Sequence, residues 1–165
     1  MARSRTADHG LDWLPKPVSP SEDFGYLAFY DSCDALLMGR KTYEACSVFS
    51  SWPYFGKTSY VFTSNLPSKP LKDVEFISEK PDAFVSKIKQ QPGKDFFLVG
   101  GGQLIDLLHD AGLIDVYIIT WMPLVLGAGI PMFPDVKKQQ NLQLVNCQAY
   151  SDIGMVQVEY RLPVK

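Results

Sequence analysis

The stretch Lys94–Gly112, KDFFLVGGGQLIDLLHDAG, decides the fold. Asp95–Val99 is short, aromatic and β-branched, which predicts a strand that is buried on both faces. Beyond the three glycines, apolar residues recur at helical spacing and predict a helix with one apolar face; these residues are Leu104, Leu107, Leu108 and Ala111. The stretch therefore reads as a buried strand, a glycine turn and an amphipathic helix.

The glycine turn is the first candidate binding site. Gly100, Gly101 and Gly102 have no Cβ atoms, so the turn can bend sharply and let another molecule lie against its backbone. The helix that follows would direct its first free N–H groups and the positive end of its dipole to the same place, which suits a phosphate. The alternative is a tight strand-to-helix corner without a ligand, because Ile105 stands where G-x-G-x-x-G needs its third glycine.

Composition narrows the class of protein. A chain of 165 residues, 46% of them hydrophobic, predicts one globular domain over residues 1–165. The net charge of −2 gives no reason to expect nucleic acid or a membrane surface as a partner. No apolar run approaches the ~20 residues that cross a bilayer, and the N-terminus lacks the apolar core of a signal peptide. We therefore expect a cytoplasmic protein.

Cysteines and histidines give no sign of a metal site. Cys33, Cys46 and Cys147 have no metal-ligand spacing and are expected to be reduced thiols. His9 and His109 are far apart and have no cysteine or acidic cluster beside them.

Outward from the opening stretch, strands alternate with helices. Residues 1–20 are polar and then rich in proline, which argues against regular structure. Helices are expected over 22–31, with Ser21 as N-cap, 40–48 and from Pro81 to about residue 90; strands are expected over 35–38, 59–63, 74–77, 114–121, 142–150 and 155–162. A shift of the apolar phase within 142–150 predicts a β-bulge. The pattern predicts a mixed α/β sheet that ends in an antiparallel hairpin.

A second candidate site follows the strand 35–38. Gly39 allows close approach, Thr42 adds a hydroxyl, and Arg40 and Lys41 add two positive charges at the start of a helix. Arginine suits a phosphate because it can donate two parallel hydrogen bonds. The alternative is two solvated basic residues, but cations are disfavoured at the positive end of a helix dipole, and an anionic partner would remove that conflict.

The third candidate is Thr63–Ser64–Asn65, after the strand 59–63. Small polar residues at this place are also ordinary turn formers. In an open α/β sheet ligands bind at the carboxyl ends of the strands. The three candidate segments, each at the carboxyl end of a strand, together suit a dinucleotide that has a pyrophosphate and an additional phosphate.

Acidic and aromatic candidates are less specific. Asp23 either complements the dipole in a first helical turn or faces a cleft, hydrogen-bonds a nitrogen heterocycle and, with a raised pKa, helps to deliver a proton. Four aromatic residues have rings that could stack on a flat ligand, but packing in the core or in loops is the default expectation for each; they are Trp13, Tyr26, Tyr43 and Trp52.

Five stretches, in order, resemble the dihydrofolate reductase superfamily, in particular its bacterial branch related to the C-terminal reductase domain of riboflavin biosynthesis proteins. They are LDWLP (11–15), DALLMGRKTYE (34–44), WPYFGKTSYVFTSN (52–65), FFLVGGGQLI (96–105) and PLVLGAGIPMF (123–133). The resemblance implies a mostly parallel sheet flanked by helices, with a C-terminal antiparallel hairpin. It also implies an oxidoreductase that binds NADPH and passes hydride to a pterin- or pyrimidine-like ring.

The resemblance also implies roles for the candidate residues. Gly39, Arg40, Lys41 and Thr42 would hold the pyrophosphate and the 2′-phosphate of NADPH. Thr63, Ser64 and Asn65 would border the adenosine. The segment Gly100–Leu104, that is Gly100, Gly101, Gly102, Gln103 and Leu104, would wrap the pyrophosphate and the nicotinamide side. Asp23 stands at about the place of the family's acidic substrate-binding residue, a match that rests on distance along the chain.

Two departures from the family pattern affect these expectations. Members normally begin with an apolar strand that ends in an SLDG-like turn and lines the nicotinamide pocket, whereas only MARSRTADHG precedes LDWLP here. We expect a shortened N-terminus or a strand supplied by another copy. The His-x-Glu and Pro-Cys-x-x-Cys signature of the zinc deaminases is absent from the sequence, so the chain is not the bifunctional riboflavin enzyme.

Three hypotheses follow. The first is an NADPH-dependent reductase of a small heterocycle. The second is a catalytically silent NADP-binding domain, which the missing first strand favours. The third, compatible with either, is a homodimer or other homo-oligomer that uses the exposed C-terminal hairpin.

Overall fold

The computed structural model describes residues 3–5, 22–65 and 71–163. Within them the chain forms two compact units, one made by Gly25–Leu113 and the other by the described residues up to Phe24 together with those from Ile114 onward. The expectation of a single domain over 1–165 stays a prediction, and each unit is described by itself.

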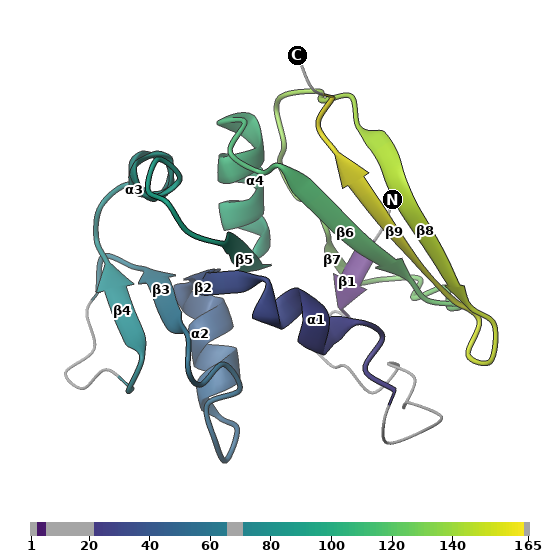
Figure 1. Cartoon of the computed structure of the whole chain (residues 1–165), viewed down its shortest axis with the longest axis horizontal. Coiled ribbons are helices and arrows are strands. Elements are labelled where there is room, and N and C mark those ends of the chain that lie inside the picture. Colours follow the sequence, from purple (N-terminus) through teal and green to yellow (C-terminus); the bar gives the residue numbers. More distant parts are fainter. Residues whose placement is uncertain (1–2, 6–21, 66–70, 164–165) are drawn as a thin grey trace. The chain divides into compact units, whose positions relative to one another are not determined.

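The unit Gly25–Leu113 is built on a parallel sheet with the strand order β4-β3-β2-β5 (Figure 1). Its strands are β2 (Cys33–Gly39), β3 (Thr58–Phe62), β4 (Val74–Ile77) and β5 (Asp95–Gly100). Gly39 pairs with Phe62, and Met38 pairs with Gly100. The last residues of β2, β3 and β5 are therefore neighbours at one edge of the sheet.

Helices cover both faces of this sheet. They are α1 (Tyr26–Asp31), α2 (Arg40–Ser47), α3 (Pro81–Ile88) and α4 (Gly102–Asp110). Figure 1 shows α1 and α2 on one face and α3 and α4 on the other. On the first face, Leu36, Met38 and Val61 are fully buried under an aromatic layer. On the second, the ring of Phe84 packs edge-on against Tyr60.

Local sequence explains where these helices begin. Each of α2 and α4 follows a strand that ends in glycine, and the glycine is the N-cap. The helix α3 begins with Pro81, whose fixed φ and missing N–H suit a first helical turn, and Asp82 follows with a charge that suits the dipole. Val85 and Ile88 of α3 are buried, as their spacing predicts.

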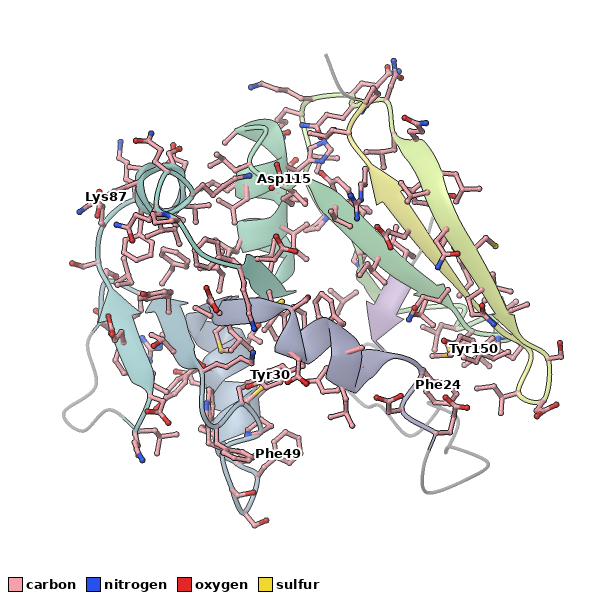
Figure 2. All side chains as sticks on the ribbon, viewed as in Figure 1. Phe24, Tyr30, Phe49, Lys87, Asp115 and Tyr150 are labelled. Carbon is pink, nitrogen blue, oxygen red and sulfur yellow. The ribbon has the colours of Figure 1, made fainter. Side chains whose placement is uncertain are left out.

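The other unit contains an antiparallel sheet with the order β6-β9-β8. Its strands are β6 (Val116–Trp121), β8 (Gln143–Tyr150) and β9 (Met155–Arg161). The register of β8 on β9 shifts between Leu144 and Asn146, which confirms the predicted bulge. In Figure 2 the rings of Phe24 and Tyr150 approach each other, with centroids 5.1 Å apart and edge-on geometry.

The predicted fold class, a mixed α/β protein with a mostly parallel sheet, flanking helices and a C-terminal hairpin, is confirmed. Three local predictions were wrong. The helix α1 begins at Tyr26 instead of residue 22, because Phe24 and Gly25 have positive φ angles of 54° and 78° that a helix cannot include. The strand β5 is mostly half-buried, and among the described residues it lies at an edge of the four-stranded sheet. Arg3–Arg5 form a short strand, β1, that pairs with β7 (Ile130–Pro131).

Candidate functional site

The N-termini of α2 and α4 meet at the carboxyl edge of the parallel sheet. A Cβ atom built on Gly39 would lie 3.8 Å from the backbone nitrogen of Gly101. A Cβ atom on Gly101 would lie 3.5 Å from Oγ1 of Thr42, and one on Gly100 would lie 3.9 Å from the same oxygen. The structure therefore brings the two predicted glycine segments into contact.

Neither helix start is satisfied by the protein's own side chains. The N-caps Gly39 and Gly101 have no side chain to cap with, and the first turns of α2 and α4 contain no acidic residue. By contrast, α3 begins at the same edge of the sheet with proline at N1 and Asp82 in its first turn. Two neighbouring helix starts thus direct uncapped N–H groups and positive dipole ends to one place, which is how proteins bind anions.

The backbone at the start of α4 has a conformation that requires glycine. Gly100 has a φ angle of +130°, which side-chain-bearing residues rarely adopt, and the peptide bond between Gly100 and Gly101 is cis. The first intrahelical bonds of α4 run from the N–H groups of Leu104 and Ile105 to the carbonyl of Gly101, at 3.0 and 3.1 Å. The N–H groups of Gly102 and Gln103 come before these bonds and are available to a ligand.

Charge at the site comes from α2. Arg40 and Lys41 occupy the first turn, and both are exposed. Nε of Arg40 donates to Oε1 of Glu44, one turn along the helix, at 2.6 Å. Sequence reasoning had overlooked Glu44, although the four-residue spacing of opposite charges was the signal that could have identified it. Glu44 relieves part of the conflict between Arg40 and the helix dipole, and a phosphate bound by Arg40 would compete with it.

The third predicted segment, Thr63–Asn65, lies beside the second, Gly39–Thr42. Thr63 follows β3, and its N–H group donates to the carbonyl of Ile77 at the end of β4, at 3.0 Å. Its hydroxyl accepts a hydrogen bond from the N–H group of Asn65 at 3.1 Å, so the segment is a side-chain-stabilised turn. Ser64 and Asn65 are exposed. Because Gly39 pairs with Phe62, this turn is the neighbour of the start of α2.

The aromatic candidates mostly pack against the sheet. Tyr43 and Trp52 belong to the layer over Leu36 and Met38, and their ring centroids are 5.6 Å apart. Tyr26 stacks on Tyr30, with centroids 5.8 Å apart. Trp13 lies outside the described residues, as do Ser21 and His9. The contacts of Tyr43 and Trp52 therefore agree with a core role.

Asp23 is described in the unit that does not contain the glycine segments. It precedes α1 by three residues, so the idea that it complements the dipole in a first helical turn was wrong. The turn at this point is instead held by Glu22, whose carboxylate accepts the N–H of Phe24 at 2.9 Å. A catalytic role for Asp23 stays a prediction.

Two searches of the described residues were negative. No cluster of three or more His, Cys, Asp or Glu side chains suits a metal ion in this part of the chain. Over the same residues, no helix has the length and apolar character that a bilayer requires.

Three comparisons place these features among known proteins. A family model described as the RibD C-terminal domain matches residues 28–154. An uncharacterized protein of Bacillus subtilis (strain 168), YwjB, is 36% identical over 154 residues, which cover 93% of this chain and 87% of YwjB.

Solved structures share the fold. A protein of Shewanella sp. PV-4, provisionally assigned to riboflavin biosynthesis, superposes with a TM-score of 0.82 at 24% identity, covering 97% of this chain and 92% of that one. The diaminohydroxyphosphoribosylaminopyrimidine deaminase/5-amino-6-(5-phosphoribosylamino)uracil reductase of Thermotoga maritima gives 0.70 at 14% identity. There the match covers 98% of this chain and 53% of that one, so this chain spans about half of the two-activity protein.

Proposed function

The chain belongs to the RibD C-terminal domain family, and from this premise we propose that it is an NADPH-dependent reductase of a small heterocycle. The substrate class is a pyrimidine- or pterin-like ring. The proposal places the protein in the cytoplasm, where NADPH is available to it.

One observation carries the proposal. The uncapped starts of α2 and α4 meet over three glycines at the carboxyl edge of a parallel sheet, with Arg40 and Lys41 beside them. The helix α3 begins at the same edge of the sheet, but its first turn contains Pro81, which has no N–H group, and Asp82, whose charge suits the helix dipole. The starts of α2 and α4 therefore offer a diphosphate more N–H groups than α3, where proline removes one donor, and they contain no carboxylate that would repel it.

The residues present fit NADPH. The N–H groups at the starts of α2 and α4 would hold the pyrophosphate, and Thr42 would add its hydroxyl. Arg40 would bind the 2′-phosphate in competition with Glu44. The turn Thr63–Asn65 would border the adenosine, because it lies one strand away from α2. When bound, NADPH supplies the hydride, and the protein contributes position and electrostatics.

Substrate chemistry also requires a proton. We assign to Asp23 the role of hydrogen-bonding a ring nitrogen of the substrate and holding the proton near it. Asp23→Asn keeps the shape and removes the acid. We expect it to lower kcat while NADPH affinity stays unchanged, and equal kcat values for the two proteins would remove Asp23 from the mechanism.

The test has two stages. Calorimetry with NADPH, NADH and 2′,5′-ADP measures binding without chemistry, and we expect NADPH and 2′,5′-ADP to bind. Oxidation of NADPH is then followed by absorbance with dihydrofolate and with 5-amino-6-(5-phosphoribosylamino)uracil, the substrate in the name of the Thermotoga maritima protein. Absence of NADPH binding by the folded protein would overturn the proposal.

A second candidate function is a catalytically silent NADP-binding protein. The observation in its favour is that, among the described residues, β5 lies at an edge of the sheet in Gly25–Leu113, whereas the family resemblance implies an additional apolar strand that lines the nicotinamide pocket. NADPH binding without turnover of any substrate in a broad panel would select this alternative.

A further inference from the structure

The helix α1 and the loop that follows α2 expose several large apolar side chains. The hydroxyl of Tyr30 on α1 donates to the carbonyl of Phe55 at 3.3 Å, so the helix and the loop are in contact. Figure 2 shows Tyr30 on α1 and Phe49 on the loop. Four side chains of these two segments keep between 59% and 80% of their surface accessible. We call them the apolar patch; they are Leu27, Val48, Phe49 and Phe55.

Charge is missing from both segments that form the apolar patch. Residues 26–30, YLAFY, and 45–56, ACSVFSSWPYFG, contain no Asp, Glu, Lys or Arg. The next residue along the chain is Lys57, and its ammonium group is already engaged. It donates to the carbonyl of Cys33 and lies 4.6 Å from the centroid of the Tyr30 ring. A phosphate on the apolar patch would therefore lose water without gaining a cation, whereas an apolar group would gain contact.

The proposed coenzyme would direct its reactive end to this side of the unit Gly25–Leu113. Its adenosine would border the turn after β3, and its pyrophosphate would lie at the helix starts that follow β2 and β5. Because the strand order is β3-β2-β5, the nicotinamide would continue to the β5 side. The helix α1 packs on this strand, with the rings of Phe29 and Phe97 4.8 Å apart and edge-on. A substrate ring in contact with the nicotinamide is therefore expected beside α1, from where a substituent can reach the apolar patch.

We propose that the apolar patch binds an uncharged apolar or aromatic substituent of the substrate. The substrate then lacks the phosphoribosyl group that is in the name of the Thermotoga maritima protein. This inference rests on the proposed function and defines its substrate more closely. A phenyl group suits the patch, because the rings of Phe49 and Phe55 can pack on it edge-on or offset.

Three uracils that differ in one substituent test the proposal. They are 5-amino-6-anilinouracil, 5-amino-6-(ribosylamino)uracil and 5-amino-6-(5-phosphoribosylamino)uracil, and calorimetry measures their binding with and without NADPH. The wild type should bind the anilino compound about tenfold more tightly than the phosphoribosyl compound, the effect of removing roughly 55 Å² of apolar area from water. The ribosyl compound should bind no more weakly than the phosphoribosyl compound, since the phosphate gains no partner.

The substitution Leu27→Lys supplies the missing cation at an exposed position. It should weaken the anilino compound and strengthen the phosphoribosyl compound, each about threefold, so that the ratio of their Kd values changes about tenfold. Leu71→Lys is the matched control: Leu71 is 41% exposed and precedes β4, at the other edge of the sheet from β5, and the ratio should stay unchanged.

A second variant removes apolar surface without adding charge. Phe55→Ser keeps the backbone carbonyl that accepts the hydrogen bond of Tyr30 and loses only the exposed ring. It should weaken the anilino compound and leave the phosphoribosyl compound unchanged. Circular dichroism checks that each variant is folded, so Phe55→Ser decides the matter if Leu27→Lys is not.

The outcomes separate this inference from the proposed function. Equal affinity for the anilino and phosphoribosyl compounds, no binding of any of the three uracils, or an anilino affinity that folded patch variants leave unchanged would each overturn the inference, even in a protein that binds NADPH. The opposite result, an anilino compound that binds and depends on Leu27 in a protein without NADPH affinity, would refute the coenzyme and leave the apolar patch as a site for a neutral aromatic ligand.

Discussion

The substitution Gly39→Ala tests the place where the two glycine segments approach each other. Gly39 has φ −82° and ψ 161°, which any residue adopts, and its new methyl group would lie 3.8 Å from the nitrogen of Gly101, an ordinary contact. The fold should therefore accept alanine. The methyl group would, however, occupy space beside the backbone nitrogen of Gly101, and it would hinder a pyrophosphate oxygen from accepting a hydrogen bond there.

The expected magnitude follows from one lost hydrogen bond. A bond from a backbone N–H to a charged acceptor contributes about 1.5–3 kcal/mol. Since about 1.4 kcal/mol is a factor of ten in affinity, the Kd of NADPH should rise about 10- to 150-fold. Stability should change by less than about 1 kcal/mol, because the poorer N-cap is offset by the lower entropy of the unfolded alanine chain.

Calorimetry with NADPH and with NADH is the assay, since both contain the pyrophosphate and both should weaken equally. Ser47→Ala, at the far end of α2, is the matched control: it removes the 2.8 Å hydrogen bond from Ser47 to the carbonyl of Glu44 and should leave both affinities unchanged. A folded Gly39→Ala protein that binds both nucleotides as the wild type does would refute the assignment of Gly101 to the pyrophosphate.

Three other substitutions probe the same reasoning. Arg40→Ala should weaken NADPH about tenfold and leave NADH unchanged, whereas Lys87→Ala, on the outer side of α3 in Figure 2, should alter neither; equal losses for the two nucleotides would mean that the 2′-phosphate lies elsewhere. Gly101→Val should reduce NADPH affinity at least 100-fold, because its methyl groups would occupy the space beside Thr42, and unchanged calorimetric affinity would contradict the site. Burial raises the pKa of Tyr117 from 10.0 to about 12, so the folded state favours the neutral phenol, and stability that is complete below pH 10 should be lost as the pH rises to 12. Tyr117→Phe should reduce this loss in urea unfolding, and identical pH profiles of the two proteins would contradict the reasoning.

Much of the parallel sheet could be predicted from the sequence, because its signals are local. Val74–Ile77 is a short apolar run between turn residues, and Pro81 marks the start of α3, so both predictions agree with the structure. The sequence also predicted that Gly39 and Gly101 lie close together, since parallel strands bring their carboxyl ends to one edge of the sheet.

What the sequence did not reveal depends on backbone conformation and on neighbouring strands. The apolar pattern around Phe24 gave no indication of two successive positive φ angles, so α1 was predicted to start too early and Asp23 was placed in its first turn. The apolar run of β5 resembled a strand covered on both faces, because strand order, which makes β5 an edge, is a non-local property. Glu44 was not predicted, because only the positive charges of Arg40 and Lys41 were considered at the start of α2.

The aromatic layer against α2 gives the molecule an optical reporter. Nε1 of Trp52 is buried and has no hydrogen-bond partner among the described residues, and Tyr43, on the helix whose start we assign to the coenzyme, packs on its ring. Fluorescence from this indole should be blue-shifted, and NADPH absorbs where tryptophan emits. Quenching of that emission on titration would therefore report occupancy in real time, with Trp52→Phe identifying the contribution of this side chain.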